Sequence, residues 1–185
     1  MSRLKERYEK EVKPALLKKF GYKNPMMIPR VEKIVVNMGI AEIAKDKNSL
    51  QDCLNEFALI TGQRPIVTRA KKSISNFKLR QGMPIGAKVT IRGERLYDFM
   101  DRFFHLVCPR IRDFRGLKPG GDKHGNCNVG LEDHTIFLEL NLDKVKTSKG
   151  MNLTFVTTAE KDEECIELLR LLGMPFKDQE VVVAN

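Results

Sequence analysis

Two hydrophobic patterns alternate along the chain, and this alternation limits the fold more than any other feature of the sequence. The segment 31–39 (VEKIVVNMG) is a run of β-prone residues in which Ile34, Val36 and Met38 share one face, and this is typical of a half-buried strand. In 49–61 apolar residues recur at the spacing of one helix face. The same patterns predict helices over 3–20, 49–61, 94–107 and 162–172, and strands over 31–39, 62–68, 87–93, 134–141 and 151–159.

The later strands are adjacent in sequence, which favours antiparallel pairing. We therefore expect an α+β sandwich: a mostly antiparallel sheet with helices on one face and an open face on the other. A chain of 185 residues can bury one core, so residues 1–177 are predicted to form a single domain. The tail 178–185 is predicted to be loose.

The start of the sequence, MSRLKERYEKEVK, has no apolar stretch and predicts no signal or transit peptide. No apolar run approaches the ~20 residues of a membrane helix. The four cysteines are scattered without disulfide-like spacing, which favours a reducing compartment. These features predict a cytoplasmic protein without a membrane partner.

Positive charge is concentrated in the middle of the chain. Residues 64–123 hold 15 Lys/Arg against 5 Asp/Glu, giving +10, whereas the whole molecule carries +9. Residues 57–93 contain eight basic residues and no acid. A solvated face normally mixes charges, because like charges repel. An acid-free basic stretch therefore indicates a polyanionic partner.

Alternation along the predicted strands assigns polar side chains to the open face. Lys33 and Asn37 share the face opposite Ile34, and Thr90 lies opposite Val89. Asn152 and Thr154 point outward in the same way. Lys and Arg suit phosphates, whereas Asn, Gln and Thr suit the 2′-hydroxyls and base edges of a shallow RNA minor groove.

The aromatic residues argue against a reader of single-stranded RNA, because no K/R-G-F/Y-G/A-F-V-x-F/Y motif is present. Structured RNA, recognised by shape and backbone, is the better prediction. Phe77 stands alone in a basic loop. It either caps a small core of that loop or stacks on an RNA surface, and the sequence leaves both open.

Long motifs carry a resemblance that covers the chain from about Leu4 to Lys177. They are VEKIVVNMG, GQRPIVTRAKKSISNFKLRQGMPIGAKVTIRGERLYDFMDRF, PRIRDFRGL and the helix start TTAEKDEE. Together they resemble the bacterial family of large-subunit ribosomal protein five, which binds 5S ribosomal RNA. The resemblance implies a ribosome-bound, non-enzymatic monomer in the central protuberance, with 5S rRNA, 23S rRNA, peptidyl-site tRNA and other ribosomal proteins as partners.

The resemblance also implies three groups of site residues. The rRNA-binding group on the open face and its edges comprises Lys33, Asn37, Gln63, Arg64, Lys88, Thr90 and Arg92. The basic loop 69–83 approaches the tRNA with Arg69, Lys71, Lys72, Ser73, Asn76, Phe77, Lys78 and Arg80. The segment PRIRDFRGL and the glycine-rich loop after it face small-subunit protein thirteen, with Arg110, Arg112 and Arg115.

Three other classes of function fit the sequence less well. A zinc site at Cys108, His124, Cys127 and His134 lacks the paired spacing of tetrahedral ligands, so a buried Cys108 and otherwise solvent-facing residues are predicted. Phosphate-loop, dinucleotide-binding and nucleophile-elbow motifs are missing, so neither an enzyme nor a cofactor is expected. A free RNA chaperone or general nucleic-acid-binding protein remains the alternative.

Overall fold

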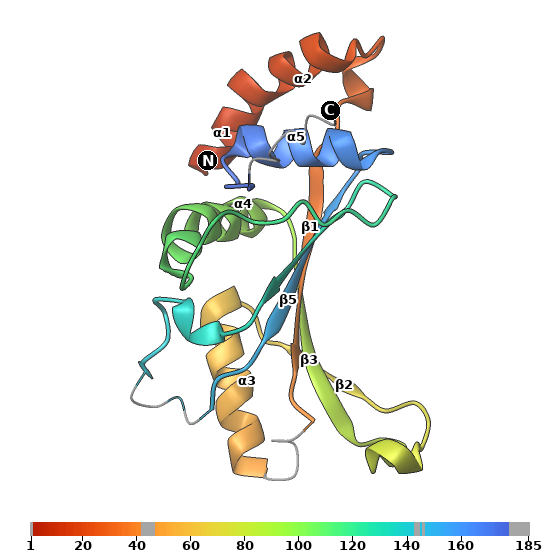
Figure 1. Ribbon diagram of the computed structural model, residues 1–185, viewed down its shortest axis with the longest axis vertical. Coiled ribbons are helices and arrows are strands. Elements are labelled where there is room, and N and C mark those ends of the chain that lie inside the picture. Colours follow the sequence, from red (N-terminus) through yellow and green to blue (C-terminus); the bar gives the residue numbers. More distant parts are fainter. Residues whose placement is uncertain (1, 42–46, 143–144, 146, 178–185) are drawn as a thin grey trace, which may run out of the picture.

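The computed structural model describes residues 2–41, 47–142, 145 and 147–177. Its centre is a five-stranded sheet in the order β2-β3-β1-β5-β4, in which all neighbours are antiparallel (Figure 1). The strands are β1 (Val31–Gly39), β2 (Ile66–Arg69), β3 (Pro84–Ile91), β4 (Cys127–Leu131) and β5 (Met151–Thr157). The helices are α1 (Arg3–Arg7), α2 (Lys13–Phe20), α3 (Lys47–Thr61), α4 (Glu94–Arg102) and α5 (Asp162–Leu172).

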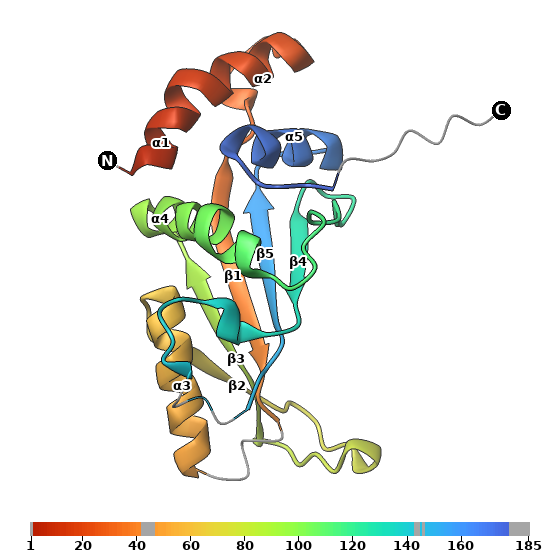
Figure 2. The same ribbon diagram turned by 60° about the vertical axis from the view of Figure 1, so that its left-hand side comes forward.

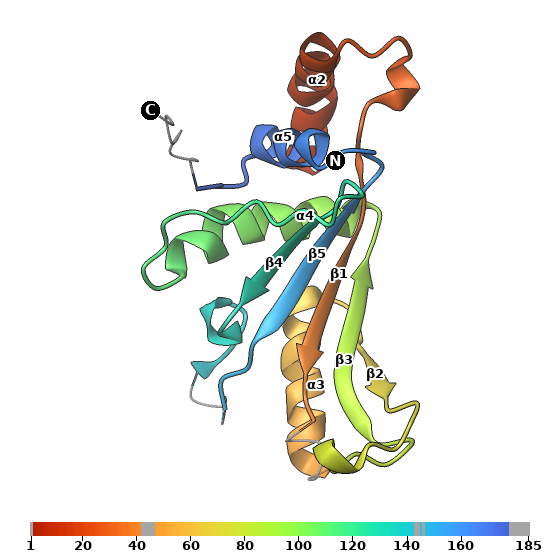
Figure 3. The same ribbon diagram turned by 45° about the vertical axis from the view of Figure 1, so that its right-hand side comes forward.

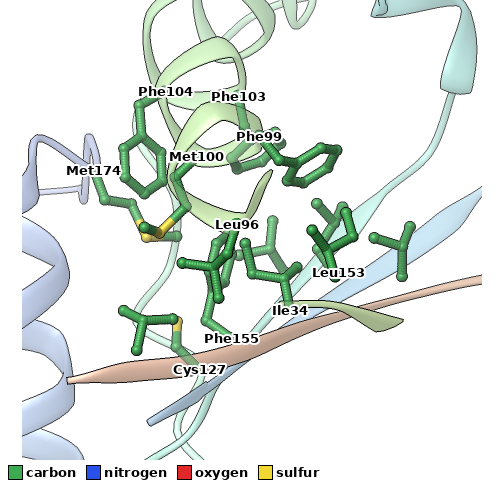
Figure 4. Packing of buried hydrophobic residues seen from close by; sticks show 14 of the residues in the cluster. Ile34, Leu96, Phe99, Met100, Phe103, Phe104, Cys127, Leu153, Phe155 and Met174 are labelled. Carbon is green, nitrogen blue, oxygen red and sulfur yellow. The ribbon is translucent and has the colours of Figure 1, made fainter. Parts of the chain in front are cut away.

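Helices α3 and α4 cover one face of the sheet, while α1, α2 and α5 gather at one end (Figure 2). The covered face receives every second side chain of the strands, as in Ile34, Val36 and Met38 of β1. From α4 and the π-helical turn 103–107 that follows it, apolar side chains such as Phe99 and Phe103 pack onto these strands (Figure 4). The result is the predicted α+β fold with one continuous core.

The N-terminal helix changes its winding without breaking. A π-helical turn at 8–12 joins α1 to α2, and Pro14, which has no N–H to donate, stands in the first turn of α2 directly after it. The buried residues Leu4, Tyr8, Val12 and Leu16 recur every four residues. They form one stripe because the wider π turn keeps this spacing on a single face.

The predicted strand over 134–141 is wrong. That segment begins with a 3-10 turn, His134–Ile136, in which the Asp133 carboxylate accepts a hydrogen bond from the Thr135 N–H at 2.8 Å. The fifth strand is instead β4, inside the segment whose glycines predict a loop. Its apolar residues are buried in strict alternation, and Gly130 faces outward.

The other elements agree with the sequence prediction to within a few residues, although β2 begins at Ile66 and β3 begins at Pro84. Residues 178–185, predicted to be a loose tail, lie outside the described residues. Among the helices described, none is long and apolar enough to cross a membrane.

Candidate nucleic-acid interface

Helices α3 and α4 leave one face of the sheet uncovered (Figure 3). Lys88, Asn37 and Asn152 are exposed, while the residues that precede and follow Asn37, Val36 and Met38, are fully buried. Two apolar residues share this face with them: Val35, which is paired with Thr90 and Thr154, and Ile66, which is paired with Lys88 and is 69% exposed.

Asn37 lies at the centre of a row of polar residues across three strands. Its partners are Lys88 on β3 and Asn152 on β5. Directly opposite residues bring their Cβ atoms within about 4.5–5.5 Å, so the amides and the ammonium share one site. Because Asn37 and Asn152 have no hydrogen-bond partner for their side chains in the described part of the chain, their amides are available to a ligand.

Near this row, two glycines on neighbouring strands are paired with each other. Gly39 is paired with Gly86, so no side chain rises from two adjacent strands. A Cβ at Gly86 would stand 2.9 Å from the Thr68 hydroxyl oxygen and 3.1 Å from the Met38 carbonyl oxygen. Gly86 is therefore needed because the Thr68 side chain of β2 fills the space that a Cβ would take.

One acid on this side is missing from the sequence prediction. Glu32 lies on β1, and its carboxylate is 3.6 Å from the Arg92 guanidinium, with both side chains about half exposed. An exposed ion pair of this kind contributes only about 0–1 kcal/mol. Arg92 can therefore exchange the carboxylate for a phosphate at little cost.

Gln63 and Arg64 precede β2 rather than opening it. Gly62, with φ +66°, turns the chain out of α3, and the Thr61 hydroxyl lies 3.1 Å from the Gln63 carbonyl oxygen. The Gln63 and Arg64 side chains are exposed at the β2 edge of the sheet. They are therefore at the rim of the open face, not on its row of paired strands.

The open face continues beyond the predicted residues onto β4. The Thr154 hydroxyl donates a hydrogen bond of 2.7 Å to the Asn128 side-chain oxygen, which leaves the Asn128 amide hydrogens free to donate. Asn128 was missed because β4 was not predicted as a strand. The signal was the alternation of Cys127, Val129 and Leu131, which the surrounding glycines obscured.

The basic loop 69–83 has a defined structure of its own. Ile74 and Leu79 exchange both backbone hydrogen bonds, at 3.0 and 3.1 Å, and Lys78 closes the turn with φ +51°. Two of the predicted contact residues stabilise the loop: the Arg69 guanidinium donates to the Gly82 carbonyl, and the Ser73 hydroxyl accepts from the Gln81 N–H. The loop is therefore a preformed projection from the β2–β3 end of the sheet (Figure 3).

The remaining predicted residues of this loop point into solvent. Phe77 is 73% exposed, so the interpretation that it caps a small core of the loop is wrong. Asn76 beside it is also exposed. The cations form no ion pair with any described residue; they are Lys71, Lys72, Lys78 and Arg80.

A second basic segment borders a groove of about 1000 Å³ between residues 110–118 and β4. Arg110, Arg112 and Arg115 are all exposed along it, with Glu132 on the opposite wall. The segment is fixed at its end, because the Leu117 N–H donates to the Pro175 carbonyl at 2.9 Å. The three arginines therefore share one surface, and the groove beside them reaches Asn128 at the β4 edge of the open face.

Two carboxylates organise the glycine-rich loop that follows. Asp162, in the first turn of α5, accepts backbone hydrogen bonds from Lys123 at 2.9 Å and Gly125 at 3.0 Å. Asp122 accepts from the Asn126 amide and the His124 N–H, and these hydrogen bonds lower the pKa of its carboxyl. Asp162 thus does more than complement the helix dipole.

The rejected zinc candidates occupy different surroundings. Cys108 is fully buried, as predicted, but Cys127 and His134 are buried as well, so the expectation that they face solvent is wrong. The His134 ring accepts a hydrogen bond from the Lys149 N–H at 3.2 Å through Nδ1. Within the described ranges, no three His, Cys, Asp or Glu side chains are grouped as metal ligands.

Comparison with known proteins identifies the family of the chain. Residues 24–80 match the family model described as ribosomal protein L5, and residues 84–176 match the model of the C-terminus of the same ribosomal family. A Large ribosomal subunit protein uL5 from Protochlamydia amoebophila is 60% identical over 184 residues, covering all of both chains. Proteins of the same name from Chlamydia abortus and a Thermoanaerobacter species are 57% and 52% identical over 177 residues, covering 96% and 95% of this chain and 98% and 99% of their own. The chain therefore belongs to the ribosomal protein L5 family, as its sequence motifs implied, and is a structural, non-enzymatic component of the ribosome.

Proposed function

We propose that this protein is a constituent of the large ribosomal subunit that binds 5S rRNA on its open sheet face and helps to attach that RNA in the central protuberance. The observation that carries the proposal is the exposed row of Lys88, Asn37 and Asn152, which are paired across β3, β1 and β5. This surface offers neutral donors and acceptors at its centre and cations toward one edge.

Such a distribution suits the minor groove of a double-stranded RNA segment. The shallow groove exposes 2′-hydroxyls and base edges, which amides and hydroxyls such as Asn37 and Thr90 can hydrogen-bond. The phosphates on either side of it suit ammonium and guanidinium groups such as Lys33, Lys88 and Arg92. Arg64 and Gln63 extend the contact at the β2 edge.

The basic loop 69–83 supports a second RNA contact, with peptidyl-site tRNA. It projects beyond the sheet, it is preformed, and its four outward cations have no acid in the loop to compete with a phosphate. The exposed Phe77 ring adds a flat surface on which a base or ribose can stack. A preformed loop also loses little conformational entropy on binding.

The arginine surface at 110–115 supports contact with a protein across the subunit interface, small-subunit protein thirteen. Arg110, Arg112 and Arg115 line a groove whose other wall contains Glu132. A surface that mixes both charges is a poorer match for RNA than the open face and a better match for a protein. The groove borders the open face at β4, whereas the basic loop lies at the β2 edge on the other side of the sheet.

The proposal is tested by exchanging polar contacts without disturbing the core. Asn37→Ala and Thr90→Ala should each weaken 5S rRNA binding by ~1–3 kcal/mol, as expected when groove contacts are removed, with unchanged melting temperature. Asn55→Ala, an exposed amide on α3, is the matched control and should bind normally. Normal binding by both open-face variants would reject this face as the 5S site.

A free RNA chaperone remains the alternative, and the same titration separates the two. A chaperone would bind unrelated structured RNA of the same length as tightly as 5S rRNA. The proposed function requires a clear preference for 5S rRNA, which should become smaller in the Asn37→Ala variant because the neutral contacts supply the specificity.

A further inference from the structure

Two consecutive methionines stand out in the connector between α2 and β1. Met26 is 90% exposed and Met27 is 59% exposed. By contrast, four other methionines are at most 2% exposed: Met38, Met100, Met151 and Met174. Long apolar side chains that remain in water on an ordered segment mark a contact site when they occur together. Methionine suits such a site because its flexible thioether adapts to an irregular partner.

The turn that carries these methionines is fixed at both ends. The Asn24 side-chain oxygen accepts from the Met26 N–H at 2.9 Å, and the Asn24 carbonyl accepts from the Met27 N–H at 3.0 Å. Ile28 is buried, and the Tyr8 hydroxyl donates to the Pro29 carbonyl at 3.0 Å. The exposure of the two side chains therefore follows from the turn's structure.

The surroundings of the turn indicate what it meets. Residues 12–31 contain no acid and five cations, a second acid-free stretch that lies outside the basic middle of the chain. Within the part of the chain described, Lys18, Lys23 and Arg30 are exposed and form no ion pair. Apolar side chains that are flanked in the sequence by unpaired cations match the ribose and base edges of a nucleic acid between its phosphates.

The position of the turn indicates which RNA. Figures 1 and 3 show the connector on the side of the sheet that α3 and α4 leave uncovered, at the end opposite the basic loop. Arg30, directly before β1, pairs with Thr158, directly after β5. The Arg30 N–H donates to the Thr158 hydroxyl, and the Arg30 carbonyl accepts from the Thr158 N–H. The surface is thus continuous with the open face.

We infer that the turn 24–28 and the cations beside it form a further contact with the RNA held on the open face, namely 5S rRNA under the proposed function on which this inference rests. Met26 and Met27 lie against ribose and base edges, and Lys18, Lys23 and Arg30 meet the flanking phosphates. The bound RNA therefore extends past the end of β1 onto the N-terminal helical segment.

Two variants test the apolar and the charged parts separately, with purified 5S rRNA as the probe. Met26→Gln/Met27→Gln keeps side-chain length and should lower affinity about threefold to tenfold, with the salt dependence unchanged. Lys18→Gln/Lys23→Gln should instead reduce the slope of log K against log salt by about 0.7–0.9 for each phosphate that the variant no longer binds.

Leu59→Gln on α3 is the matched control, because Leu59 is 60% exposed on the covered side of the sheet. It should bind like the unaltered protein. If the unaltered protein binds 5S rRNA and both turn variants bind it equally well, the inference is overturned while the proposed function stands. A loss of binding to purified 23S rRNA alone would also overturn it, by assigning the turn to another RNA. If the unaltered protein fails to bind 5S rRNA, the proposed function itself is rejected.

Discussion

At the scale of single residues, the cysteines show how far the environment of a side chain departs from its sequence pattern. All four are buried. Burial raises the pKa of Cys108 and Cys165 to about 12 and that of Cys127 to about 11, because a thiolate would lose its hydration. Sequence spacing argued against a zinc site, but it could not show that Cys127 lies in the core beside the predicted Cys108.

The buried thiols give a prediction about reactivity. At the pKa of about 12 of Cys108 and Cys165, only about one thiol in ten thousand is ionised at pH 8, and the thiolate is the reactive form. Burial also raises the pKa of Cys53 and Cys127. Iodoacetamide at pH 8 should therefore leave the native protein unlabelled over an hour, as measured by intact mass. After denaturation in urea, all four cysteines should be labelled. Rapid labelling of the native protein would contradict the burial of these side chains.

The open-face residues were predicted more completely than the core thiols. Asn37, Lys88 and Thr90 follow from strict alternation in β1 and β3, which needs only the strand and one buried neighbour. Glu32 was not recognised as part of the same surface, because β1 has a register shift between Val31 and Lys33 that alternation does not predict. Its ion pair with Arg92 joins two segments that are far apart in the sequence, so local sequence patterns do not predict it.

At the scale of elements, the exchange of one strand for another is the main error of the sequence prediction. Residues 134–141 (HTIFLELN) have the β-prone composition of a strand, but the Asp133 cap starts a 3-10 turn there. Strand β4 contains Asn128 and Gly130, which have low strand propensity, and its pairing with β5 outweighs that propensity. Helices α3 and α5 were predictable because long helical periodicity is a stronger signal.

The basic loop is an element whose role can be separated from that of the sheet. Replacing Lys71, Lys72, Lys78 and Arg80 together by Ala should leave 5S rRNA binding intact, because the loop extends beyond the β2–β3 end of the sheet (Figure 3). Ribosomes that contain the variant should retain peptidyl-site tRNA less firmly, since four phosphate-binding charges are removed.

Both affinities should be measured on the same variant, with melting temperature as the control for folding. Arg69 and Ser73 are kept, because they hydrogen-bond within the loop and replacing them would change its shape. Loss of 5S binding with normal tRNA retention would reverse the assignment. The loop would then be part of the primary RNA site.

At the scale of the whole molecule, positive charge is concentrated in one part of the fold and negative charge in another. Residues 64–123 carry +10, and they supply β2, β3 and the basic loop. Residues 124–185 carry 6 Lys/Arg against 11 Asp/Glu, giving −5, and they supply β4, β5 and α5. Membership of the ribosomal protein L5 family confirms the prediction of a cytoplasmic, ribosome-bound protein.

This separation of charge predicts a steep dependence of 5S rRNA binding on salt. With about six phosphate contacts, log K should fall with a slope near −4 to −5 against log salt, because each contact releases condensed counterions. Filter binding or fluorescence anisotropy between 50 and 300 mM KCl, roughly the range in which such slopes are resolved, gives the slope directly. The Lys33→Gln/Lys88→Gln variant should have a slope that is less steep by about 1.4–1.8. Asn37→Ala should weaken binding at every salt concentration and leave the slope unchanged. A flat profile for the unaltered protein would mean that the basic middle of the chain does not meet the phosphates of this RNA.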